Sequence, residues 1–82
     1  MKSVLYTRTA ATALRRHANR AKLIRTKFRQ YADDASSQAN NVKPLIGVDA
    51  KRLRVGDFRV IFTDTTDTIT ILDIGPRGGI YE

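Results

Sequence analysis

The sequence has 82 residues, 41% of them hydrophobic, which is enough for one compact domain with a modest core, so we expect a single domain over residues 1–82. Fifteen Lys and Arg against eight Asp and Glu give a formal net charge of +7, which attracts polyanions such as nucleic acid, the ribosome or an acidic protein. The absence of cysteine and the single His17 exclude disulfide frameworks, thiolate metal sites and a histidine-based zinc site. We expect neither a metal nor a cofactor.

Apolar runs in this sequence are only a few residues long. The N-terminal residues Met1–Tyr6 lack the apolar segment of a signal peptide. We therefore expect a cytoplasmic protein that does not associate with membranes.

The first half of the chain predicts one strand followed by two helices. Strand-forming residues occupy 3–7, and Thr7 or Thr9 can cap a short alanine-rich helix over residues 10–17. At the end of that helix, His17 is better explained as a complement to the helix dipole than as a catalytic base.

A second helix is predicted from the cap candidate Asn19 to about Asp33 and Asp34. Its apolar residues recur at intervals of three, four and seven, at Ala21, Ile24, Phe28, Tyr31, Ala32 and Ala35. Its cations are candidate contacts for RNA phosphates, although such a stripe is more often a solvated surface: Arg20, Lys22, Arg25, Lys27 and Arg29. The polar residues 36–41 then predict a loop that runs to about Asp49.

In the second half the apolar residues recur every second position, which is typical of strands. Leu53 and Val55 alternate with arginines, Gly56–Asp57 indicates a tight hairpin, and a second turn is expected over 63–68 before a central strand at 69–74. The resulting order, β-α-α-β-β-β, indicates an α+β fold with two layers, in which both helices pack on one face of the sheet.

Arginines gather on the predicted hairpin. Arg52 and Arg54 share one face of a strand, and the tight turn brings Arg59 beside them. Like charges across strands are destabilising unless an anion lies between them, so this cluster predicts a site for a phosphodiester, with Lys51 as a further contact. Salt bridges to Asp49, Asp57 or Asp73 are the structural alternative.

Two further candidate residues follow the last strand. Arg77 lies in a glycine-rich segment whose backbone can approach a ligand, and Tyr81 could stack on a base or donate its hydroxyl, or simply close the edge of the core. Phe28, Tyr31, Phe58 and Phe62 have the spacing of core residues.

The segments Arg52–Phe62 and Ile71–Tyr81 resemble the RelE/ParE superfamily of toxins from type II toxin–antitoxin modules, and Val42–Gly47 is similar to the loop that precedes them. The resemblance implies an antiparallel sheet flanked by two N-terminal helices, with the first strand in the same sheet. It also implies a cognate antitoxin and a toxin–antitoxin hetero-oligomer.

In the RelE branch, the resemblance implies a ribosome-dependent endoribonuclease that cuts mRNA without metal, through attack of the ribose 2′-hydroxyl on the adjacent phosphodiester. Arg59 and Arg77 match its two functional arginines, Tyr81 its C-terminal tyrosine, and Arg52 a position that is usually basic. The implied roles are phosphate stabilisation for Arg52 and Arg59, a leaving-group role for Arg77, and orientation or stacking of the base for Tyr81.

The sequence departs from the RelE pattern at three places. Ala50 replaces a lysine of RelE, Pro76 stands where relatives often have His or Lys, and the chain stops at Glu82, without the C-terminal helix of some members. The ParE branch, which binds DNA gyrase without catalysis and shares much of the arginine block, is therefore the alternative function. A chain that only binds an antitoxin is the third.

Overall fold

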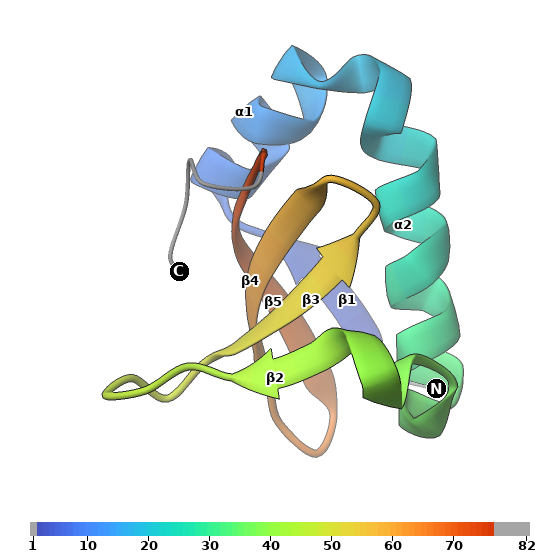
Figure 1. The fold of residues 1–82 in the computed structure, drawn as a ribbon, viewed down its shortest axis with the longest axis vertical. Helices are drawn as coiled ribbons and strands as arrows, with labels where there is room; N and C mark the ends of the chain where they lie inside the picture. Colours follow the sequence, from blue (N-terminus) through green and yellow to red (C-terminus); the bar gives the residue numbers. More distant parts are fainter. Residues whose placement is uncertain (1, 77–82) are drawn as a thin grey trace.

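The computed structural model describes residues 2–76, which form an α+β fold around one mixed five-stranded sheet (Figure 1). The strands lie in the order β1-β5-β4-β3-β2. The sheet was expected to be antiparallel, but β1 runs parallel to β5, and only the other pairs are antiparallel. The elements are β1 (Ser3–Tyr6), α1 (Arg8–Arg16), α2 (Ala18–Asp33), the 3-10 helix η1 (Ala35–Asn41), β2 (Val42–Pro44), β3 (Lys51–Val55), β4 (Phe58–Asp64) and β5 (Thr68–Pro76).

Thr7 is the residue that starts the first helix. Its hydroxyl accepts a hydrogen bond from the Ala10 N–H at 3.1 Å and donates one to the Leu72 carbonyl at 3.0 Å. The cap thus fixes both the helix start and its position against β5, and the helix begins before the predicted residue 10.

His17 ends α1, and its ring packs edge to face on Phe58 at 4.8 Å between centroids. The second helix starts at Ala18, one residue before the predicted cap Asn19.

The predicted hairpin is present. Gly56 has φ of +58°, a backbone conformation that glycine adopts without strain, and it joins β3 to β4 so that Leu53 pairs with Val60 and Arg54 with Arg59. The alternation of side chains then sends Leu53 and Val55 to the core and the arginines to the opposite face.

The region predicted as a loop up to Asp49 contains two elements that the sequence patterns did not indicate. The Asp34 side chain accepts from the Ser36 N–H at 3.1 Å and starts η1, which leads directly into β2. Strand β2 pairs Lys43 with Arg52, so the sheet has one strand more at this edge. Three residues are too few for a two-residue period to appear in the sequence.

The core lies between the helices and one face of the sheet. Phe28, Tyr31 and Phe62 form a triangle of edge-to-face ring contacts, with centroids 5.1 to 6.4 Å apart. Ile24 from α2 and Leu14 from α1 belong to the same buried cluster, so both helices cover one face, as predicted. The predicted core residue Phe58 is only half-buried, at the rim of this cluster.

Asp64, the last residue of β4, is a nearly buried carboxylate that joins β4 to α2, to β3 and to Lys2, which precedes β1. Its oxygens bind the ammonium of Lys2, accept a hydrogen bond from the Tyr31 hydroxyl at 2.7 Å, and lie 3.7 Å from the ammonium of Lys51. Burial acts to raise the pKa of Asp64, but the hydrogen bonds from Lys2 and Tyr31 outweigh it and lower the pKa. Burial together with the Asp64 carboxylate raises the pKa of Tyr31 to about 12.

Candidate functional site

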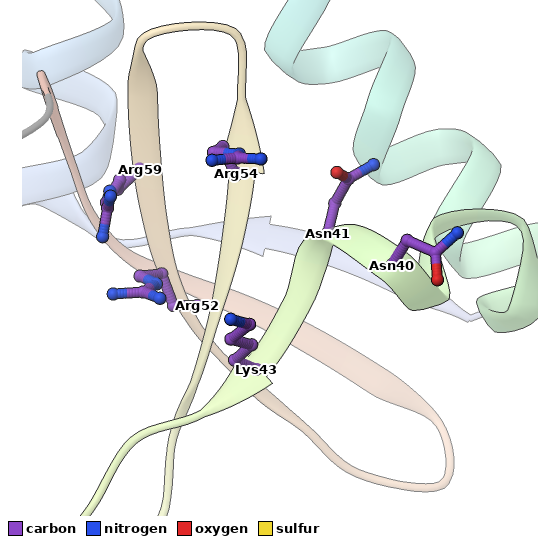
Figure 2. Close-up of a pocket in the computed structure, with 6 residues that line it drawn as sticks. All are labelled: Asn40, Asn41, Lys43, Arg52, Arg54 and Arg59. Atoms are coloured by element: carbon purple, nitrogen blue, oxygen red, sulfur yellow. The ribbon is translucent and has the colours of Figure 1, made fainter.

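A pocket on the face of the sheet opposite the helices is lined by four cations from three strands (Figure 2). The register places Lys43 opposite Arg52 and Arg54 opposite Arg59, and the end of η1 closes the pocket with two amides. Among residues 2–76, the pocket is lined by Asn40, Asn41, Lys43, Arg52, Arg54 and Arg59. Its volume is about 90 Å³, which is enough for several water molecules or a phosphate group.

Among residues 2–76, no carboxylate lines this pocket. Neither Arg52 nor Arg54 forms an ion pair with an acidic side chain of these residues, whose ion pairs are those of Asp64 with Lys2 and Lys51. The structural alternative of salt bridges from these two arginines to Asp49, Asp57 or Asp73 is therefore not seen there. The charges of Arg52 and Arg54 thus contribute a positive field that attracts an anion.

The surroundings of the cations strengthen that field. Arg59 is 8% exposed, and Ile61, which lies opposite Arg52 in the register, is 2% exposed. Charges interact more strongly where apolar groups replace water, because the local dielectric constant is lower. A phosphate oxygen in this pocket would therefore be bound more firmly than on an open surface of equal charge.

The sequence-predicted residues divide between this pocket and other places. Arg52, Arg54 and Arg59 come together in it. Lys51 does not belong to it, because neighbouring residues of a strand face opposite sides and its ammonium lies at Asp64 instead. Arg77 and Tyr81 lie outside the described residues.

The cations of α2 also lie outside this pocket, which we call the arginine pocket after Arg52, Arg54 and Arg59. Arg20, Lys22 and Arg25 are exposed on the helix and Lys27 is half-buried. Arg25 lies over the ring of Tyr6, 5.7 Å from its centroid, and with Arg29 it lines a separate cavity of about 280 Å³ between α2 and β1. Burial raises the pKa of Tyr6, an effect that these two arginines partly offset.

Three pocket residues were not among the sequence predictions: Lys43, Asn40 and Asn41. All three lie in the segment predicted as a loop. The available signal was the basic residue of the Val42–Lys43–Pro44 segment, but only the pairing of β2 with β3 shows which face it occupies.

Within residues 2–76 no group of three or more histidine and acidic side chains is placed to hold a metal ion. None of the helices described is long and apolar enough to cross a membrane.

Comparison with known proteins identifies the family. The sequence matches the family of the ParE toxin of the type II toxin–antitoxin system, parDE, over residues 4–81. The chain belongs to this ParE toxin family. It is therefore a toxin of the RelE/ParE superfamily, as the resemblance of its arginine block indicates.

Solved structures share the fold of this ParE-family toxin over nearly its full length. The archaeal RelE–RelB complex from Pyrococcus horikoshii OT3 contains a chain with 25% identity and a TM-score of 0.75, covering 96% of this chain and 98% of that one. A YafQ mutant from E. coli has 12% identity and a TM-score of 0.72, with both chains covered completely. A chain of the E. coli DinJ–YafQ toxin–antitoxin complex has 17% identity and a TM-score of 0.67, and the match covers 99% of this chain and 98% of that one. No curated protein matches the sequence.

Proposed function

We propose that this toxin is a ribosome-dependent mRNA endoribonuclease whose reaction centre is the arginine pocket. The observation that carries the proposal is the convergence of Lys43, Arg52, Arg54 and Arg59 on one small pocket. The similarity to the archaeal RelE chain, at 25% identity over almost the whole length, supports the same function.

The proposed chemistry is a transesterification within the RNA. The 2′-oxygen of the ribose attacks the adjacent phosphorus, the bond from phosphorus to the 5′-oxygen breaks, and the 2′-hydroxyl proton is lost while the 5′-oxygen gains one. Negative charge builds up on the non-bridging oxygens in the pentacoordinate transition state. Arg52 and Arg59 hold fixed guanidinium groups where these oxygens would lie, and such groups stabilise the transition state more than the ground state.

Proton transfer to the leaving oxygen needs a donor close to the pocket. An arginine is a poor donor, because its pKa is above about 12. From the family resemblance, we assign Arg77 to the leaving-group side and Tyr81 to the orientation of the substrate base. The ribosome would hold the mRNA in place for this reaction.

An antitoxin is the proposed protein partner. The similar chains in two solved structures are bound to their antitoxins, RelB and DinJ. A net charge of +7 favours an acidic segment that covers the pocket, in a hetero-oligomer formed in the cytoplasm.

Gyrase inhibition is the second candidate, and the family match to the ParE toxin of parDE favours it. The two functions are separated by giving the purified chain either programmed ribosomes, with mapping of mRNA 5′ ends, or gyrase in a supercoiling assay. Cleaved mRNA with normal supercoiling supports the endoribonuclease. Intact mRNA with lost supercoiling would replace it by the gyrase inhibitor.

A further inference from the structure

The wall of the arginine pocket formed by η1 differs from its other walls, because it is neutral. Asn40 and Asn41 line this side, at the point where η1 leads into β2. Cations alone would bind any phosphate, so the amides are the groups in the pocket that can distinguish what is attached to the phosphate.

Asn41 is held by a chain of amides that begins on α2. Gln38, buried at 4% exposure, donates from its Nε2 to the Gln30 Oε1 at 3.0 Å. Its own Oε1 then accepts from the Asn41 Nδ2 at 3.5 Å. A glutamine side chain has one carbonyl oxygen and one amino group, so with its amino group on Gln30 the carbonyl end of Gln38 meets Asn41.

In this arrangement of amides, the oxygen of Asn41 faces the pocket. Since the Asn41 nitrogen is directed to Gln38, its Oδ1 lies on the other side, and Figure 2 shows this oxygen on the side of Arg54. From residues 2–76, Oδ1 accepts no hydrogen bond. The pocket therefore combines cations with one oriented acceptor.

The cations bind a negatively charged group such as a phosphate, and the acceptor beside them can bind a hydrogen-bond donor of the same ligand. We propose that Asn41 Oδ1 is a base-reading acceptor, selecting nucleotides whose base carries an exocyclic amino group next to the bound phosphate. The proposal rests on the endoribonuclease function given above and adds to it a specificity residue.

Cytosine and uracil provide the sharpest comparison. The two pyrimidines have the same ring size, but cytosine carries an amino group where uracil carries a carbonyl oxygen. Uracil has a donor only at its ring N–H, between two carbonyl oxygens that Oδ1 would repel. A single hydrogen bond of this kind contributes enough to change affinity by about threefold to tenfold.

The test measures binding of the full chain to two short RNAs, r(UUCU) and r(UUUU), by isothermal titration calorimetry. We expect r(UUCU) to bind about threefold to tenfold more tightly. Replacing Asn41 by leucine, a side chain of similar size without an acceptor, should make the two affinities equal while phosphate binding persists. Asn19→Leu, the same substitution at an exposed position of α2, is the matched control and should keep the preference.

Gln38→Met is a second test variant, because it removes the carbonyl oxygen that binds the Asn41 side chain and leaves Asn41 itself unchanged. It should reduce the cytosine preference even if Asn41→Leu fails to fold. Equal affinity of the unmodified chain for both RNAs, or a preference that survives in Asn41→Leu, would overturn the proposal. Neither result would affect mRNA cleavage on the ribosome, whose absence would instead overturn the proposed function.

Discussion

Lysine and arginine have different surroundings on the two faces of the sheet. On the helix side, Lys2 and Lys51 meet the carboxylate of Asp64, which also accepts from Tyr31. On the opposite face, four cations line one pocket, to which residues 2–76 contribute no acidic side chain. The first arrangement balances charge within the chain and stabilises the fold, whereas the second gathers positive charge that favours an anionic ligand.

The comparison predicts its largest effect at Arg52. Replacing it by glutamine removes one guanidinium from the transition-state oxygens, so mRNA cleavage should fall by about 10² to 10³-fold. The thermal midpoint should stay the same or rise, because repulsion among like charges decreases. Rates of mRNA cleavage on programmed ribosomes and a thermal melt measure the two. Arg15→Gln, exposed on α1, is the control and should cleave normally. Full cleavage by Arg52→Gln would place the reaction elsewhere.

Replacing Asp64 should have the opposite effects, namely a loss of stability with little change in RNA binding. Asp64→Asn should lower the free energy of unfolding by about 2 kcal/mol, because hydrogen bonds to a charged group are lost. RNA binding should change little once the variant is folded. Urea denaturation and calorimetry with r(UUCU) measure the two effects. Since the pKa of Asp64 is lowered below its usual 3.8, this stabilisation is complete above that pH and disappears as the pH falls through the folded pKa. An unfolding free energy that does not depend on Asp64 at neutral pH would show that the carboxylate is dispensable.

Tyr31→Phe tests the same face with a smaller change. It removes one hydroxyl, and the free energy of unfolding should fall by about 1 kcal/mol. The pKa of Tyr31 is raised from 10.0 to about 12, so the hydroxyl stabilises fully below pH 10 and its contribution is lost as the pH rises toward 12. Urea denaturation of both proteins from pH 8 to 12 measures the difference between them. A gap that stays constant over this range would contradict the assignment.

The smallest effect is expected at Lys43, in the salt dependence of RNA binding by the pocket. For single-stranded RNA, each phosphate that a cation neutralises adds about 0.7 to the slope of log affinity against log salt. Lys43→Gln should reduce the slope by about that amount, whereas Lys51→Gln, on the Asp64 side, should leave it unchanged. Calorimetric titrations with r(UUCU) at several salt concentrations give both slopes. Equal reductions in the two variants would mean that the faces do not differ as described.

Much of this fold could be predicted from local chemistry. Thr7 caps a helix through its own side chain, and Gly56 makes a turn through its own backbone, so both signals are contained in a few neighbouring residues. Strand β2 could not be predicted in this way, because its three residues are ordered by pairing with β3 rather than by their own pattern. The pairing of β1 with β5 joins residues 65 positions apart, as Ser3 with Thr68. The family resemblance implied that the first strand belongs to the sheet, but not that it runs parallel to its neighbour.

The candidate site was predictable to a similar degree. Arg52, Arg54 and Arg59 follow from strand alternation and one tight turn, which are local. Lys51 was assigned to nucleic acid because it is adjacent in sequence, but the decisive contact is with Asp64 on another strand. Asn41 depends on Gln38 and Gln30, whose amides meet only when η1 folds back onto α2. Residues oriented by such distant partners leave no periodic signal in a sequence.

The pairing of β1 with β5 also has a consequence for biosynthesis. Ser3–Tyr6 leave the ribosome first, but their partners, Thr68–Ile71, are made more than sixty residues later. Contacts between such distant segments delay folding until both are available. A nascent chain that ends before Thr68 therefore cannot assemble the complete sheet, because the partner of β1 has not yet been made.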